Sequence, residues 1–124
     1  MRNRHVLYDV WLADGAPLER VKPLEALMQR AALEGGATIL HAYFHPFAPT
    51  GVTGFVLLAE SHLSVHTWPE ERFAAFDIFS CGNMDTARIV EVLREGLRPV
   101  REDLRLIQRG VALGEKGAQW TGES

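Results

Sequence analysis

The sequence contains a single cysteine, Cys81, and this scarcity restricts the chemistry open to the chain. One thiol cannot form an internal disulfide, which predicts a cytoplasmic protein in a reducing compartment. Zinc sites usually combine several cysteines and histidines at close spacing. His62 and His66 stand four residues apart in a strand-like pattern with no third ligand beside them, so we predict no metal site.

The chain also has no long apolar run and no excess of positive charge. Asp9 and Asp14 interrupt the N-terminal apolar stretch, so we predict neither a signal peptide nor a membrane span. Thirteen Lys and Arg residues are scattered among 16 Asp and Glu residues, for a net charge of −3, which argues against nucleic-acid binding. A chain of 124 residues fits one domain. Domains of this size bury only about two-thirds of their unfolded surface, which leaves pairing with a second copy open.

Hydrophobic periodicity predicts six strands and two helices. Apolar residues recur at three- and four-residue steps over residues 18–33 and 85–97, which is typical of amphipathic helices. Alternating or continuous apolar runs predict the strands, which cover residues 6–13, 37–44, 52–59, 63–68, 73–79 and 104–108.

The resulting order is β-α-β-β-β-β-α-β. Consecutive strands with short links cannot be parallel crossovers, so we expect a mainly antiparallel sheet. Two helices on one face then give an α+β fold, a two-layer sandwich, whose helix-free face suits a dimer or a ligand. Residues 111–124 show no clear period, and we predict a flexible C-terminal tail after a single domain of residues 1–110.

The most informative segment is Glu60-Ser61-His62-Leu63-Ser64-Val65-His66-Thr67-Trp68-Pro69-Glu70. A serine hydroxyl can attack the carbonyl of the preceding residue, here Glu60, to form an ester. Elimination then breaks the chain and leaves a dehydroalanine at residue 61, which water hydrolyses to a pyruvoyl group with release of ammonia. This chemistry needs a donor for the oxyanion and a base near the serine Cα proton. His66, within one strand's length, is a candidate base, although a lone serine or histidine here is more often only structural.

Three further residues have both a structural and a functional interpretation. Cys81 ends a strand before Gly82, where a thiol can act as a proton donor, although free cysteine is usually a small core residue. Phe47 lies between two prolines in a loop, where burial is hard to arrange. Trp68 alone favours a core position, and Glu70 alone is as often a solvated residue.

Together these residues resemble the signature of the prokaryotic S-adenosylmethionine decarboxylase proenzymes, which depend on a pyruvoyl group. The resemblance covers about residues 5–110 and rests on residues 44–54, 60–70, 75–82 and Arg109-Gly110. It implies cleavage between Glu60 and Ser61 into a β chain of residues 1–60 and an α chain of residues 61–124. It also implies a homodimer with two sites, each built from both protomers.

The same resemblance implies a role for each site residue. Ser61 becomes the pyruvoyl cofactor, whose carbonyl forms a Schiff base with S-adenosylmethionine and accepts electrons as CO₂ departs. The product supplies aminopropyl groups for spermidine. His66 acts in processing, Cys81 reprotonates the product, and Thr53 stands where the family usually has a processing serine. The implied substrate contacts are Phe47 and Trp68 on the adenine and sulfonium, and Glu70 on the ribose hydroxyls.

Some positions depart from the family pattern and keep alternatives open. Pro46 stands where arginine is common, the first strand lacks the usual Gly-Cys ending, and Glu71 and Arg72 add charge beside the presumed pocket. Relatives with the same cofactor decarboxylate ornithine or arginine, which is the second hypothesis. A non-catalytic paralogous subunit is the third, and it would be expected to have lost Ser61 or its partners.

Overall fold

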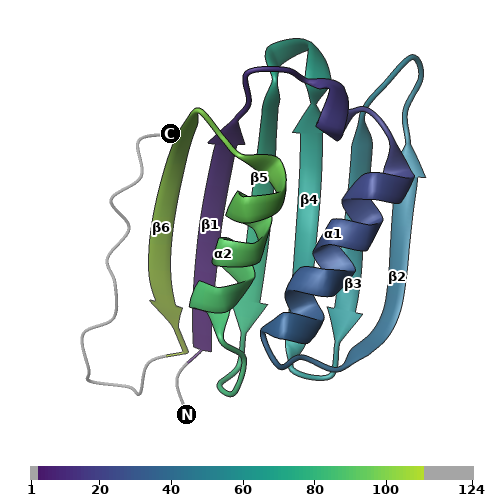
Figure 1. Ribbon diagram of the computed structural model, residues 1–124. Helices are drawn as coiled ribbons and strands as arrows, with labels where there is room; N and C mark the ends of the chain where they lie inside the picture. Colours follow the sequence, from purple (N-terminus) through teal and green to yellow (C-terminus); the bar gives the residue numbers. More distant parts are fainter. Residues whose placement is uncertain (1–2, 111–124) are drawn as a thin grey trace.

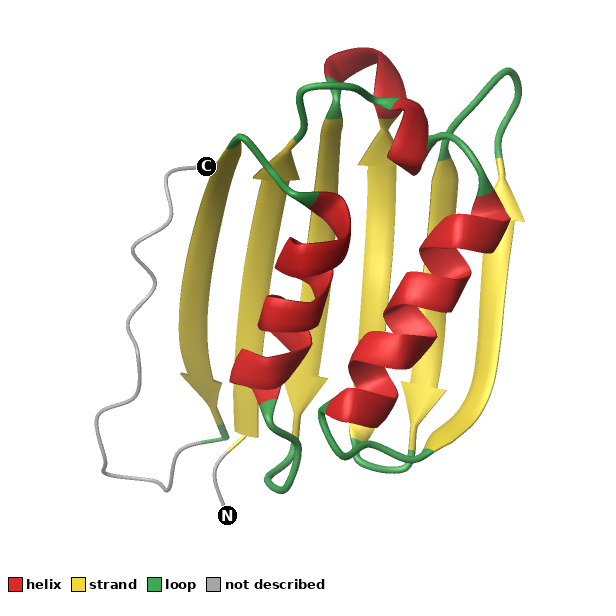
Figure 2. Cartoon of the chain, in the orientation of Figure 1, coloured by secondary structure: helices red, strands yellow, loops and turns green. Residues whose placement is uncertain are grey.

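Six strands form one antiparallel sheet, and two helices cover one of its faces (Figures 1 and 2). The computed structural model describes residues 3–110. The strands are β1 (Asn3–Trp11), β2 (Ile39–Pro46), β3 (Val52–Leu58), β4 (Ser61–Trp68), β5 (Phe73–Ser80) and β6 (Arg101–Arg109). The helices are α1 (Val21–Glu34) and α2 (Thr86–Leu97), with short 3-10 turns η1 (Ala16–Leu18) and η2 (Pro69–Glu71).

The predicted two-layer α+β sandwich and its order of elements are confirmed. The strand order is β2-β3-β4-β5-β1-β6, and every neighbouring pair is antiparallel. Several predicted ends were wrong. The first helix starts at Val21 rather than residue 18, because η1 comes before it. The last strand spans Arg101–Arg109 rather than 104–108, because its pairing with β1 continues as far as Trp11 and Arg101. The predicted tail, residues 111–124, lies outside the described residues.

Alternation along the strands directs one set of side chains under the helices. In β4, Leu63 and Val65 are buried on this side, and in β5 the neighbouring Phe76 and Ile78 join them. The helices contribute Leu24, Met28, Ile89 and Leu93 to the same core. Each large apolar side chain fully buried in this way stabilises the fold by about 1.5–3 kcal/mol. The core therefore holds the sheet and both helices in one unit.

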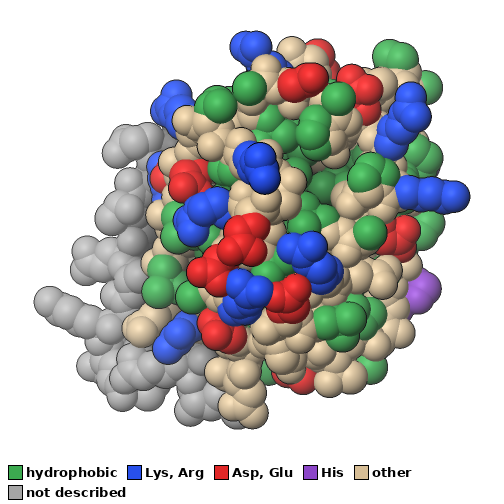
Figure 3. Space-filling model, viewed as in Figure 1, with side chains coloured by type: hydrophobic (Ala, Val, Ile, Leu, Met, Phe, Trp, Pro, Cys, Tyr) green, Lys and Arg blue, Asp and Glu red, His purple; other side chains and the backbone are tan. Residues whose placement is uncertain are grey.

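The two outer surfaces of the sandwich differ in character. On the helix side, acidic and basic side chains are interspersed (Figure 3), and Arg88 pairs with both Glu34 and Glu91. The opposite face of the sheet, here called the open face, has no described helix or strand over it. Phe55 and Leu57 are exposed there by 39% and 42%. Exposed apolar side chains that lie together on a sheet face are typical of a surface that contacts another molecule.

Candidate functional site

The predicted cleavage site lies at a tight hairpin. β3 and β4 are joined by two residues, Ala59 and Glu60, and Leu58 pairs directly with Ser61. The sequence placed the start of this strand at Leu63, but pairing extends it back to Ser61. The Glu60–Ser61 peptide bond therefore joins the turn to the first residue of β4.

Cys81 reaches this peptide bond from the neighbouring strand. Ser61 pairs with Ser80 at the end of β5, so the next residue, Cys81, lies opposite Glu60. The Cys81 N–H donates to Glu60 O at 3.3 Å, and the thiol Sγ donates to the same oxygen. That oxygen would become negative if Ser61 attacked the carbonyl, and donors aimed at it stabilise such a charge. The sequence pointed to Cys81 as a proton donor but did not foresee this contact.

A second group of predicted residues lines a cavity of about 310 Å³ at the other end of β3 and β4. We call it the His66 cavity. Its walls include all five remaining candidates, namely Phe47, Thr53, His66, Trp68 and Glu70, together with Thr50, Gly51 and Thr67. The candidates come from the β2–β3 loop, β3, β4 and η2. The structure thus brings together residues that are 23 positions apart in sequence, from Phe47 to Glu70.

Thr53 and His66 are bonded within this cavity. They are directly opposite each other on β3 and β4, and Thr53 Oγ1 lies 3.0 Å from His66 Nδ1. Threonine at this position therefore keeps the hydroxyl contact despite its extra methyl group. A bond to Nδ1 fixes the orientation of the ring and leaves Nε2 as the second functional nitrogen.

The aromatic walls of the cavity keep exposed surface. Phe47 is 51% exposed and Trp68 is 40% exposed. Trp68 stacks on Phe73 with centroids 5.4 Å apart, and Phe73 contacts Trp11 at 5.0 Å. This row of rings braces Trp68 from one side. Exposed aromatic faces of this kind suit a flat or positively charged ligand.

Thr67 fixes the loop that carries Phe47. Its buried hydroxyl donates to Leu18 O and accepts from Val52 N, both at 2.9 Å. Gly51, in the same loop, has a φ of +117°, a conformation that disfavours other residues, and its carbonyl accepts from Phe47 N at 2.9 Å. These contacts hold the loop against β3 and β4 and so shape the cavity.

The spacing of His66 and Ser61 along one strand does not bring them together within one chain, and the role of His66 as a base stays a prediction. The two residues lie at opposite ends of β4. Five residues of extended chain span about 17 Å, and an odd spacing directs the two side chains to opposite faces. The candidate residues therefore form two separate groups. The cleavage end holds Glu60, Ser61 and Cys81, and the His66 cavity holds the other five.

Glu71 and Arg72 also differ from expectation. They line a separate cavity of about 460 Å³ with Trp11, Leu12, Ala13, Val100 and Arg101, rather than the His66 cavity. Arg72 has a φ of +57° at the end of η2, and its carbonyl accepts a hydrogen bond from Leu12 N. The added charges therefore do not line the His66 cavity.

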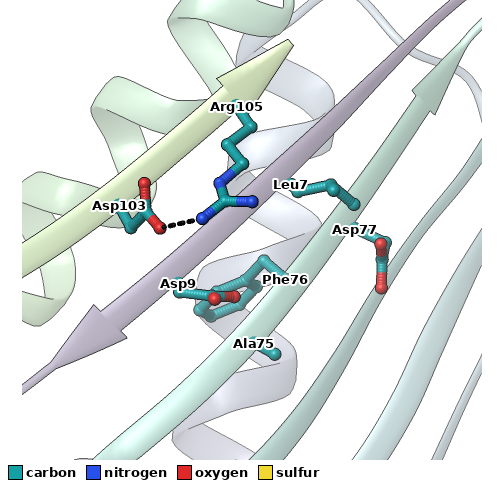
Figure 4. Close-up of a pocket in the computed structure, with 7 residues that line it drawn as sticks. All are labelled: Leu7, Asp9, Ala75, Phe76, Asp77, Asp103 and Arg105. Carbon is teal, nitrogen blue, oxygen red and sulfur yellow. Dashed lines mark hydrogen bonds and ion pairs between the residues drawn. The ribbon is translucent and has the colours of Figure 1, made fainter. Parts of the chain in front are cut away.

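Sequence reasoning missed a hollow in the open face (Figure 4). Its polar side chains are Asp9, Asp77, Asp103 and Arg105, and Asp103 pairs with Arg105 at 3.2 Å. Burial, and then the charge of Asp103 directly opposite, raise the pKa of Asp9. No local motif signals this cluster, because its members come from three strands whose order is set by the fold.

Histidines lie between this hollow and the cleavage end. His5 Nε2 lies 3.0 Å from Asp77 Oδ1, and the His5 and His62 rings each pack against Phe79. Burial, and next the nearby His5, lower the pKa of His62. These effects favour the neutral form of His62, the residue that follows Ser61.

Residues 3–110 show neither a membrane-spanning helix nor a cluster of metal ligands. None of the helices in this range has the length and apolar character needed to cross a membrane. Across the same residues, histidine, cysteine and acidic side chains do not gather in groups of three or more suited to a metal ion.

Comparison with known proteins gives a consistent result. A family profile described as S-adenosylmethionine decarboxylase matches residues 4–110. The chain is 41% identical over 108 residues to the "S-adenosylmethionine decarboxylase proenzyme" of Thermotoga maritima, covering 86% of this chain and 83% of that protein. It is 42% identical over 110 residues to the protein of the same name from Parasynechococcus marenigrum, covering 88% and 86%.

A solved structure agrees with the sequence matches. The crystal structure of the adenosylmethionine decarboxylase from Aquifex aeolicus superimposes with a TM-score of 0.83 at 34% identity. The superposition covers 92% of this chain and 95% of that one.

Proposed function

Because the chain belongs to the S-adenosylmethionine decarboxylase family, we propose that it is a proenzyme that cleaves itself and then decarboxylates S-adenosylmethionine. Cleavage falls between Glu60 and Ser61 and leaves a β chain of residues 1–60 and an α chain of residues 61–124. The observation that carries this proposal is the pair of Cys81 donors on Glu60 O. A carbonyl so held is prepared for attack by the neighbouring hydroxyl.

Cleavage is the step that would generate the cofactor. Oγ of Ser61 attacks the Glu60 carbonyl carbon, and the peptide bond is replaced by an ester. His66 of a second copy then removes the Cα proton of Ser61, with its ring oriented by Thr53, and the Cβ–Oγ bond breaks. The dehydroalanine left at residue 61 would be hydrolysed to a pyruvoyl group with loss of ammonia. A pyruvoyl group at residue 61 supplies a ketone that accepts the electrons released when CO₂ leaves an attached substrate. Cys81, beside the same residue, returns a proton to the product carbon.

The His66 cavity would hold the nucleoside end of the substrate. The exposed rings of Phe47 and Trp68 can pack on adenine and on the sulfonium, and a cation over a ring gains about 0.5–2 kcal/mol. Glu70, in the same cavity, can accept hydrogen bonds from the two ribose hydroxyls. S-adenosylmethionine is favoured over ornithine or arginine, because Glu71 and Arg72 line a different cavity and Phe47, Trp68 and Glu70 remain together.

A complete site would require two copies of the chain. Ser61 and Cys81 lie at one end of β4, and His66 lies at the other. In a two-fold dimer packed through the open faces, the cleavage end of one copy can meet the His66 cavity of its partner. Two-fold symmetry then forms two equivalent sites. Exposed Phe55 and Leu57 on the open face supply apolar surface for such a contact. We place this dimer in the cytoplasm, in keeping with the single free thiol, Cys81, of each copy.

Intact mass spectrometry of the purified protein tests the proposal first. We expect two fragments, residues 1–60 and 61–124, with the second reactive towards borohydride at its ketone. Ser61→Ala should remain one chain without activity. A wild-type chain that stays whole after long incubation would instead favour a non-catalytic subunit. Measuring CO₂ release from S-adenosylmethionine, ornithine and arginine in parallel then identifies the substrate, and release only from an amino acid would overturn our assignment.

A further inference from the structure

The side chain of Glu60 is held in place as well as its carbonyl. The main-chain N–H of Thr38 donates a hydrogen bond of 3.0 Å to Glu60 Oε1. The preceding residue, Ala59, donates its N–H to Thr38 O at 2.9 Å. Both residues of the β3–β4 turn are therefore bonded to one residue, which lies just before β2.

The segment that carries Thr38 is itself anchored to both helices. Ala37 N donates to Ala32 O in α1 at 2.9 Å. Asp85 N, at the start of α2, donates to Gly35 O at 2.9 Å. A bond to Thr38 thus fixes the Glu60 side chain relative to the helical layer, and not only to a neighbouring loop.

The two polar ends of Glu60 are drawn to opposite sides of the turn. β3 pairs with β2 on one side of the hairpin, and β4 pairs with β5 on the other. The carboxylate contacts Thr38 on the β2 side, whereas the carbonyl oxygen contacts Cys81 on the β5 side. This matters because a free carboxylate close to the carbonyl would repel the negative charge that develops there during attack.

We propose that the Glu60 carboxylate is a positioning residue for self-cleavage, acting through Thr38; this rests on the proposed function. In the first step Ser61 Oγ bonds to the Glu60 carbonyl carbon, the C–N bond breaks, and the hydroxyl proton passes to the released nitrogen. The Thr38 contact keeps the carbonyl oxygen at the Cys81 donors while it is charged. In the second step a base takes the Cα proton and the Cβ–Oγ bond of Ser61 breaks. Glu60 then leaves as a carboxylate containing both oxygens.

Cleavage kinetics of three variants test this role. Wild type, Glu60→Ala, Glu60→Gln and Thr38→Ala are made by cell-free translation, and the 61–124 fragment is followed over time by mass spectrometry. Glu60→Ala should cleave about tenfold more slowly, because one hydrogen bond to a charged group is lost. Glu60→Gln keeps an acceptor oxygen and should stay within about twofold of wild type. Thr38→Ala keeps the main-chain donor and is the matched control, with an unchanged rate.

A parallel series separates positioning from folding. The same substitutions are placed in the uncleavable Ser61→Ala chain, and their urea unfolding midpoints are compared. Slower cleavage of Glu60→Ala with an unchanged midpoint supports the inference. If Glu60→Ala does not fold, Glu60→Asp replaces it. This variant has a shorter side chain and should cleave more slowly than Glu60→Gln. If Glu60→Ala cleaves at the wild-type rate, or if Glu60→Gln cleaves as slowly as Glu60→Ala, the role of the Glu60 carboxylate is wrong but the proposed function still stands. A wild-type chain that never splits overturns the proposed function as well.

Discussion

The distance between Ser61 and His66 predicts that each chain is processed with the help of its partner. Along β4 the two residues are about 17 Å apart. Proton transfer needs the two heavy atoms to lie within about 3 Å of each other, or to be bridged by one water molecule. If His66 of the partner is the base, His66→Ala should slow cleavage roughly 10²- to 10⁴-fold, the usual contribution of a general base.

Mixed dimers test this directly. His66→Ala and Ser61→Ala chains carry different tags and are expressed separately and together. Neither should yield fragments when expressed alone. In a mixed dimer, the Ser61 of the His66→Ala chain faces an intact His66, so that chain should be cut. With random pairing, about half of the His66→Ala chains lie in mixed dimers and should appear as fragments.

Matched controls decide between the alternatives. Coexpression of His66→Ala with Cys81→Ala,Ser61→Ala chains should restore cleavage equally well, because the second chain contributes only its His66 cavity. Two chains that both carry His66→Ala should remain whole. If the His66→Ala chain stays uncut beside Ser61→Ala, or cleaves normally by itself, the arrangement of the site across two copies is wrong.

Three other substitutions test the cavity and the sheet. Thr67→Val leaves Val52 N and Leu18 O without their partner. It should lower the free energy of unfolding, measured in urea, by about 2–4 kcal/mol. Thr67→Ser keeps the hydroxyl and should keep most of the wild-type stability. Glu70→Gln should raise KM for S-adenosylmethionine about tenfold with little change in kcat, and an unchanged KM would count against the ribose contact. Asp9→Asn should stabilise the fold at pH 7. Because the pKa of Asp9 is raised in the folded chain, the wild-type protein loses stability as the pH rises and Asp9 ionises. The stability gained by Asp9→Asn should therefore vanish near pH 4, where Asp9 is protonated. An equal gain at pH 4 and pH 7 would contradict this explanation.

Local patterns predicted the elements, because each depends on neighbours in sequence. The apolar steps of α2 and the alternation of β4 identify a helix and a strand without reference to the rest of the chain. The strand order was not accessible in this way. β1 lies between β5 and β6, so Asp9 meets Asp103 from a segment more than 90 residues away. The acidic hollow follows from that long-range pairing and has no signal in either segment alone.

The candidate residues were found by their resemblance to a family, but their grouping depended on strand register. Cys81 contacts Glu60 only because Ser61 pairs with Ser80 across β4 and β5. The number of residues between Glu60 and Cys81 does not by itself fix this pairing. The register of β4 and β5 depends on the conformation of the turn at η2 that joins them.

The odd spacing of Ser61 and His66 did, however, contain usable information. A strand directs residues five positions apart to opposite faces and separates them by about 17 Å. A catalytic pair at that spacing on one strand cannot meet within a single chain, whatever the rest of the fold. The Glu60–Glu70 segment carries Ser61 at one end and His66, Trp68 and Glu70 towards the other. In the dimer proposed above, two-fold symmetry would bring unlike ends of two such segments together, so that one short motif would supply both halves of both sites.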